Sequence, residues 1–118
     1  MICTTVNGKY ETEIFSRADY IVLIKDGKII YKEENPALHV KERRPTVAKR
    51  CMELGAQVIV APHGSLCLPS YMILSKGGKA MYVTKTGEAV DELRVWPINA
   101  GEVAYSSLLA VWERISRG

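Results

Sequence analysis

Apolar residues in this chain fall into short runs separated by polar turns, a pattern typical of β-strands that follow each other closely in sequence. The clearest pair covers residues 18–25 and 28–32, with Asp26-Gly27 between them. Asp-Gly is the strongest short-range signal for a β-hairpin, because both turn positions tolerate a positive φ angle. We therefore predict an antiparallel hairpin over residues 19–33.

After the hairpin, helix-like and strand-like segments alternate. Helices are predicted at residues 45–54 and 69–76, because each begins with a proline, which suits the first helical position, and ends before a glycine. The runs at 58–61 and 80–84 are almost wholly apolar, as in strands buried on both faces of a sheet. With a first strand at residues 1–6, this alternation predicts parallel crossover units.

Two further helices are predicted after the last of these strands. Thr86 caps a short acidic helix to residue 93, and Asn99 with Glu102 resembles a capping box that starts a helix to about residue 116. One apolar stripe of the last helix recurs at spacings of four, three and four: Ala104, Leu108, Val111 and Ile115. The expected fold class is α/β, a three-layer domain with a mixed, mostly parallel sheet that starts with a hairpin.

Composition excludes several classes of protein. The 118 residues are expected to form one domain, and 47% hydrophobic with 25% charged residues is ordinary for a globular protein. The net charge of +3 is spread along the chain, which argues against nucleic-acid binding. No apolar run reaches the roughly 18 residues of a membrane span. The N-terminus lacks the charged-then-apolar order of a signal peptide.

The cysteines predict a reducing compartment. Cys3, Cys51 and Cys67 show no CxxC spacing, and an odd number makes a poor disulfide framework. We therefore expect a cytoplasmic protein in which Cys3 and Cys51 are ordinary core side chains.

Candidate chemistry gathers where the apolar run at 58–61 ends. The stretch PHGSLC (residues 62–67) lies between a buried strand and a helix N-terminus, where α/β sheets bind ligands. Gly64 lets the backbone approach a ligand, and the helix start offers N–H groups and a positive dipole to an anion. The thiol of Cys67 and the imidazole of His63 suit iron, copper or zinc.

Three other interpretations stay open. Cys67 can be a small buried side chain and His63 a hydrogen-bond partner of the loop. The same pair can also serve a small thiol-dependent enzyme, with His63 as the base. The third alternative is a protein-interaction module without a ligand, because Leu109 and Trp112 lie off the main stripe of the last helix. This second face predicts a homodimer through the C-terminal helix.

Four stretches carry a family resemblance: IFSRADY (14–20), ENPALH (34–39), VIVAPHG with the helix to residue 76, and AMYVT followed by EAV (80–90). They resemble motifs of the dinitrogenase iron–molybdenum cofactor biosynthesis family, the NifX/NifB-type domain. Ile14 and Ser16 stand where the family has histidine and glycine. The similarity covers roughly residues 1–93, so the helix at 99–116 is an extension.

The resemblance implies a ribonuclease H-like fold and a non-enzymatic domain. Such a domain binds or carries an iron–sulfur or iron–molybdenum-type cluster or its precursor. With Ile14 in place of the family's histidine, the expected cofactor-binding residues are His63, Gly64, Cys67 and His39, of which the two histidines and the cysteine are the metal ligands. The expected partners are cluster-assembly or cluster-receiving proteins, with neither nucleic acid nor a membrane among them.

Overall fold

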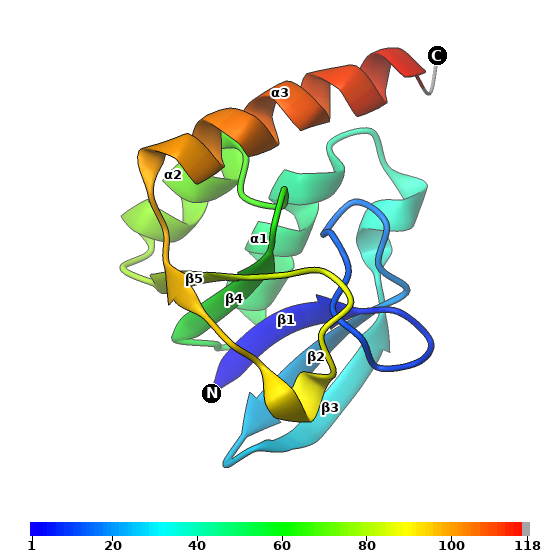
Figure 1. The fold of residues 1–118 in the computed structure, drawn as a ribbon, viewed down its shortest axis with the longest axis vertical. Helices are drawn as coiled ribbons and strands as arrows, with labels where there is room; N and C mark the ends of the chain where they lie inside the picture. Colours follow the sequence, from blue (N-terminus) through cyan, green and yellow to red (C-terminus); the bar gives the residue numbers. More distant parts are fainter. Residues whose placement is uncertain (117–118) are drawn as a thin grey trace.

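A six-stranded mixed sheet forms the centre of the computed structural model, which describes residues 1–116. The strands, in the spatial order β3-β2-β1-β4-β5-β6, are β1 (Ile2–Val6), β2 (Tyr20–Lys25), β3 (Lys28–Glu34), β4 (Val58–Pro62), β5 (Ala80–Thr84) and β6 (Trp96–Pro97). The helices are α1 (Arg43–Glu53), α2 (Leu68–Lys76) and α3 (Ala100–Ser116), with 3-10 turns η1 (Pro36–His39) and η2 (Val90–Glu92) (Figure 1). The predicted α/β class and mixed sheet are confirmed.

The predicted hairpin is also confirmed. β2 and β3 pair antiparallel, from Tyr20 opposite Glu34 to Lys25 opposite Lys28. Asp26 and Gly27 have φ angles of 52° and 76°, the left-handed conformation that a two-residue turn of this kind requires.

The sheet is less parallel than predicted. β1 pairs with β4, and β4 with β5, in parallel, whereas the other three of the five pairings are antiparallel. The reason is that β1 lies beside the hairpin and runs against β2, while the chain after β5 folds back to add β6. Only the segments joined through α1 and α2 form the parallel part.

Different layers cover the two faces of the sheet. α1 and α2 pack on one face, around a core that includes Phe15, Ile59 and Leu74. On the other face, Val90 and Leu93, in and beside η2, pack against a smaller cluster that includes Val22. The chain thus places its helices on one side and the η2 segment on the other.

The acidic helix predicted for residues 86–93 is wrong. Only Val90–Glu92 form a single 3-10 turn. The loop near the N-terminus explains the difference, because the Thr12 N–H donates to the Glu88 carbonyl (2.8 Å) and the Tyr10 carbonyl accepts from the Val90 N–H (3.1 Å), two groups that a helix would need for its own hydrogen bonds. These bonds hold the segment against a loop near the N-terminus, where a helix cannot continue.

Two of the three cysteines are bonded to each other. α1 faces the sheet with Val47, Ala48 and Cys51. Cys51 forms a disulfide with Cys3 of β1, with the two Cα atoms 5.8 Å apart. The interpretation of these cysteines as unpaired was wrong, because an odd count does not prevent two of them from meeting in the fold. The argument from cysteine usage to a reducing cytoplasm therefore loses its basis, and the compartment stays a prediction.

α3 turns a polar side toward the domain. Its predicted start is confirmed, because Asn99 Oδ1 accepts from the Glu102 N–H at 2.8 Å. α3 then lies across the ends of α1 and α2 (Figure 1). Its buried residues are Glu102, Ser106 and Glu113. The apolar stripe that an amphipathic helix would normally bury points to solvent instead. No helix within residues 1–116 is long and apolar enough to cross a membrane.

Candidate functional site

The corner after β4 is held against α3. His63 Nδ1 lies 2.6 Å from Glu102 Oε1, and the His63 ring stacks on Tyr105 with the ring centroids 4.4 Å apart. The Gly64 N–H donates to Glu102 Oε2 at 2.8 Å. Gly64 has a φ angle of 93°, and a Cβ at this position would meet Leu109 Cδ2 at 3.0 Å. The close approach that Gly64 permits is therefore to the chain's own helix.

Glu113 anchors the other half of α3. The buried Arg44 of α1 donates to the two carboxylate oxygens of Glu113 at 2.9 and 3.1 Å. Arg44 Nε also donates to the Gly64 carbonyl at 2.8 Å, and the Ser16 hydroxyl donates to Glu113 at 2.8 Å. Burial raises the pKa of the Glu113 carboxyl, but the hydrogen bonds from Arg44 and Ser16 outweigh burial and hold that pKa below its ordinary value. α3 is thus attached to the domain by buried carboxylates.

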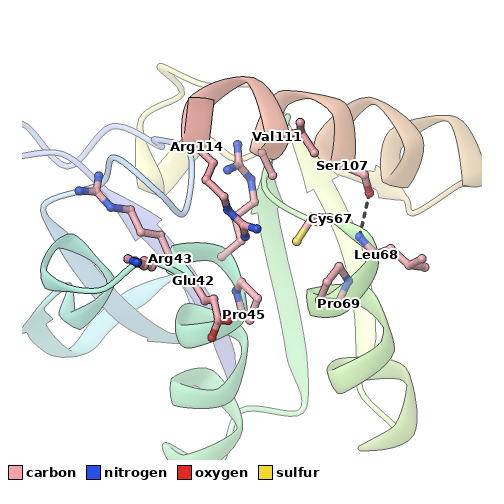
Figure 2. A pocket seen from close by; sticks show the side chains of 12 residues that line it. Glu42, Arg43, Pro45, Cys67, Leu68, Pro69, Ser107, Val111 and Arg114 are labelled. Atoms are coloured by element: carbon pink, nitrogen blue, oxygen red, sulfur yellow. Dashed lines mark hydrogen bonds between the residues drawn. The ribbon is translucent and has the colours of Figure 1, made fainter. Parts of the chain in front are cut away.

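A groove of about 270 Å³ opens between the starts of α1 and α2 and one flank of α3 (Figure 2). Residues 41–45 line it on the side of α1, and residues 67–69 on the side of α2. α2 follows β4 in sequence, so it begins at the carboxyl end of this strand. α1 precedes β4 and ends near the strand's beginning, so the start of α1 lies at the carboxyl end as well. This is the edge at which open α/β sheets bind ligands.

The groove combines apolar walls with cationic side chains. Lys41, Arg43, Arg44 and Arg114 line it, with Glu42 as the acidic residue of the lining. Arg44 is neutralised by its ion pair with the buried carboxylate of α3, and among the other lining residues Arg43 and Arg114 outnumber Glu42. Arg114 is exposed and extends from α3 toward the first turn of α1 (Figure 2). The electrostatic balance of the groove favours an anion.

The helix starts at this groove lack the usual N-cap hydrogen bonds, and one buried donor beside them has no partner among the described residues. Neither N-cap residue, Glu42 of α1 or Cys67 of α2, accepts a hydrogen bond from its helix through its side chain. The Leu68 N–H of α2 donates instead to Ser107 Oγ of α3 at 2.9 Å (Figure 2). Arg43 Nε is buried and has no hydrogen-bond partner within residues 1–116. Because helix starts carry a partial positive charge and orphan donors, an anionic group would satisfy both.

The three predicted metal ligands have separate surroundings. Cys67 lines the groove, is 4% exposed and has its Sγ 3.2 Å from Ser70 Oγ. His63 is not part of the groove lining. His39, on η1, is exposed and lies 3.5 Å from Glu34. The described part of the chain has no group of three or more His, Cys, Asp or Glu side chains that could hold a metal ion. The structure therefore does not gather these ligands into one group, and a metal at the corner stays a prediction.

Sequence reasoning missed the charged residues that build the site. Arg44 and Arg114 were only part of a scattered positive charge, Glu102 was named only as part of a capping box, and Glu113 was not singled out. One signal was available: Glu102 and Glu113 are eleven positions apart, about three helical turns, so they lie on one face with Ser106. A helix face that carries two carboxylates opposite an apolar stripe is either exposed to solvent or packed against a buried cation. In this structure the cation is Arg44.

Comparison with known proteins adds information on the fold. No family model matches the sequence. No curated protein matches it either. The chain is similar in structure to a solved protein described as the crystal structure of PH0822, with a TM-score of 0.54, 13% sequence identity, and coverage of 80% of this chain and 95% of that chain. At this identity the similarity extends to the α/β fold and to nothing finer.

Proposed function

We propose that this chain is a non-enzymatic binding domain whose groove takes a small anion with an apolar body, such as an alkyl or aryl carboxylate or phosphate. The observation that carries the proposal is the gathering of cations and of two helix starts without an N-cap side-chain hydrogen bond around an apolar groove at the carboxyl end of β4. The charged oxygens accept hydrogen bonds from Arg114 and from the start of α1. The apolar body lies against Pro45 and Val111.

The size of the groove limits the ligand. Small-molecule sites range from about 300 to 1,000 Å³, so a volume near 270 Å³ lies at the lower end. A short fatty acid or a single aromatic ring with one anionic group is of suitable size. Ligands this small reach affinities on the order of micromolar to millimolar, because few atoms contribute to binding.

An iron–sulfur or iron–molybdenum-type cluster is the second candidate for the same groove. Cys67 favours it, because a thiolate is the usual protein ligand of such clusters and this thiol lines the groove. One thiol does not complete a ligand set, however, and neither His63 nor His39 lines the groove beside it. An organic anion accounts for the shape and charge of the groove without further ligands, so we favour it.

Isothermal titration calorimetry with octanoate, and with uncharged octanol as the matched probe, tests this proposal. Wild type is expected to bind octanoate and to bind octanol much more weakly. Arg114→Ala should weaken octanoate binding by roughly tenfold, because it removes an exposed guanidinium from the groove. Lys76→Ala, the same loss of charge at the far end of α2, should leave the affinity unchanged. Equal binding of octanol, or an unaltered affinity in Arg114→Ala, would contradict the proposal.

A reconstitution experiment separates the two candidate ligands. The protein is incubated anaerobically with iron and sulfide, and bound iron is measured after gel filtration. Iron that wild type retains and Cys67→Ser loses would select the cluster. Octanoate binding with no retained iron would select the organic anion.

A further inference from the structure

We infer that the outer face of α3 is a self-association surface, on which a second copy of this chain docks antiparallel to form a two-fold dimer. This inference is independent of the groove and of its ligand. It starts from the orientation of α3, which turns its polar side toward the domain and its apolar stripe toward solvent. The outward positions of the helix are Gly101, Ala104, Tyr105, Leu108, Val111, Trp112 and Ile115.

None of these seven outward residues is charged. Leu108 is 73% exposed and Trp112 65%, and the other three large side chains of the face are between 46% and 68% exposed. With ordinary side-chain areas, these exposed fractions correspond to roughly 700 Å² of apolar surface, whereas the largest patch of a typical monomer is about 300–600 Å². A standard interface buries about 800 Å² per partner, so a second α3 and its flanks are enough to cover this face.

The distribution of large and small residues favours an antiparallel pair. In a two-fold pair centred on Leu108, Ala104 lies opposite Trp112, because both are four positions from the centre. Gly101 likewise lies opposite Ile115, seven positions from the centre. Trp112 and Ile115 then each meet a small residue, as close helix packing requires, while Leu108 meets its own symmetry mate and Tyr105 meets Val111. A parallel pair would place Trp112 against Trp112 and leave Ala104 facing Ala104.

The anchoring of α3 supports a rigid docking surface. Glu102 and Glu113 fix the two halves of the helix to the domain through the hydrogen bonds described above, so the outer face is presented without a cost of ordering the helix. A lipid surface is a poorer occupant. The basic residue of α3 is Arg114, and interfacial helices bind anionic lipids through several lysines and arginines.

Sedimentation equilibrium of the full chain at about 100 µM tests the dimer. Wild type is expected at twice the 13.1 kDa chain mass, and Leu108→Glu at the monomer mass, because two carboxylates would meet on the two-fold axis. Ile30→Glu, which changes an exposed apolar residue of β3, should remain dimeric. Circular dichroism checks that each variant is folded. A monomeric wild type, or a Leu108→Glu variant that stays dimeric, would overturn the inference.

Cysteine cross-linking tests the orientation. Leu108→Cys should form a disulfide-linked dimer on mild oxidation, whereas Ala104→Cys should not, because its symmetry mate lies eight positions, or about 12 Å, along the helix axis. The remaining free thiol of the described chain, Cys67, is buried and does not interfere. Cross-linking of Ala104→Cys as efficient as that of Leu108→Cys would refute the antiparallel pair.

Discussion

At the residue scale, the contact between Glu113 and Arg44 decides which side of α3 faces the domain. A carboxylate and a guanidinium are rarely buried unless they are paired, and this pair joins α1 to α3 with two nearly parallel hydrogen bonds. Removing one member of a buried pair leaves the other charge without compensation. Glu113 is therefore more important for the position of α3 than any apolar residue of that helix.

This contact predicts a specific pH dependence of stability. The pKa of Glu113 is lower in the folded chain than its ordinary value, so its stabilising effect is complete at neutral pH and is lost as the pH falls through the folded pKa. Glu113→Gln should lower the free energy of unfolding at pH 7 by about 3 kcal/mol and make its decrease toward pH 3 less steep. Urea unfolding over that pH range measures both effects.

The exposed Glu92 provides the control for this prediction. Glu92→Gln should leave the free energy of unfolding at pH 7 and its pH dependence as in wild type. If the free energy of unfolding falls by the same amount in wild type and in Glu113→Gln between pH 7 and pH 3, the carboxylate does not stabilise the fold through its charge.

At the element scale, the sequence predicts those elements whose signals are local. The hairpin follows from Asp26-Gly27, whose left-handed backbone needs only its own two residues. The start of α3 follows from Asn99, because a helix cap involves neighbours in sequence. The acidic helix at 86–93 fails for the opposite reason, since Tyr10 and Thr12, far away in sequence, bind the Val90 N–H and the Glu88 carbonyl that a helix would pair internally. The helix propensity of a segment contains no information about hydrogen-bond partners that lie far away in sequence.

The orientation of α3 is the largest difference between expectation and structure. Periodicity locates the apolar stripe of a helix but not the layer that covers it, and a helix normally buries this stripe in its own domain. In this chain Arg44 and the corner at His63 bind the carboxylates on the opposite side. The candidate site was predicted only in part. Cys67 lines the groove and His63 does not, and the cations that give the groove its charge come from α1, from the residues just before it and from α3.

At the scale of the whole molecule, the disulfide between Cys3 and Cys51 ties the central strand to the helical layer. It closes a loop with a sequence separation of 48 residues, for which chain entropy corresponds to a stabilisation of about 4 kcal/mol.

Dithiothreitol should reduce the disulfide and so lower the free energy of unfolding, measured in urea, by up to about 4 kcal/mol. The double variant Cys3→Ala/Cys51→Ala should be insensitive to dithiothreitol, and Cys67→Ser as sensitive as wild type. A thiol titration of the unreduced protein in denaturant should find one free thiol per chain, and three free thiols would show that the bond does not form.

The two proposed surfaces share Val111 at their border, but the rest of each lies on a different side of α3, so binding in the groove and pairing of two copies are compatible in one assembly. The flank of α3 that lines the groove carries Ser107 and Arg114, whereas Leu108 and Trp112 point away from the domain. Each function can therefore be removed without the other.

The most direct test of the binding function is a titration of isotope-labelled protein with octanoate, followed by amide chemical shifts. The proposal predicts that the largest shifts occur at the start of α1 (residues 41–45), at residues 67–69, and on the flank of α3 near Arg114. Amides of the hairpin at Asp26-Gly27 should stay unchanged and serve as an internal control. Shifts confined to the outer face of α3 around Leu108, or no shifts at millimolar octanoate, would contradict the assignment of the groove as the ligand site.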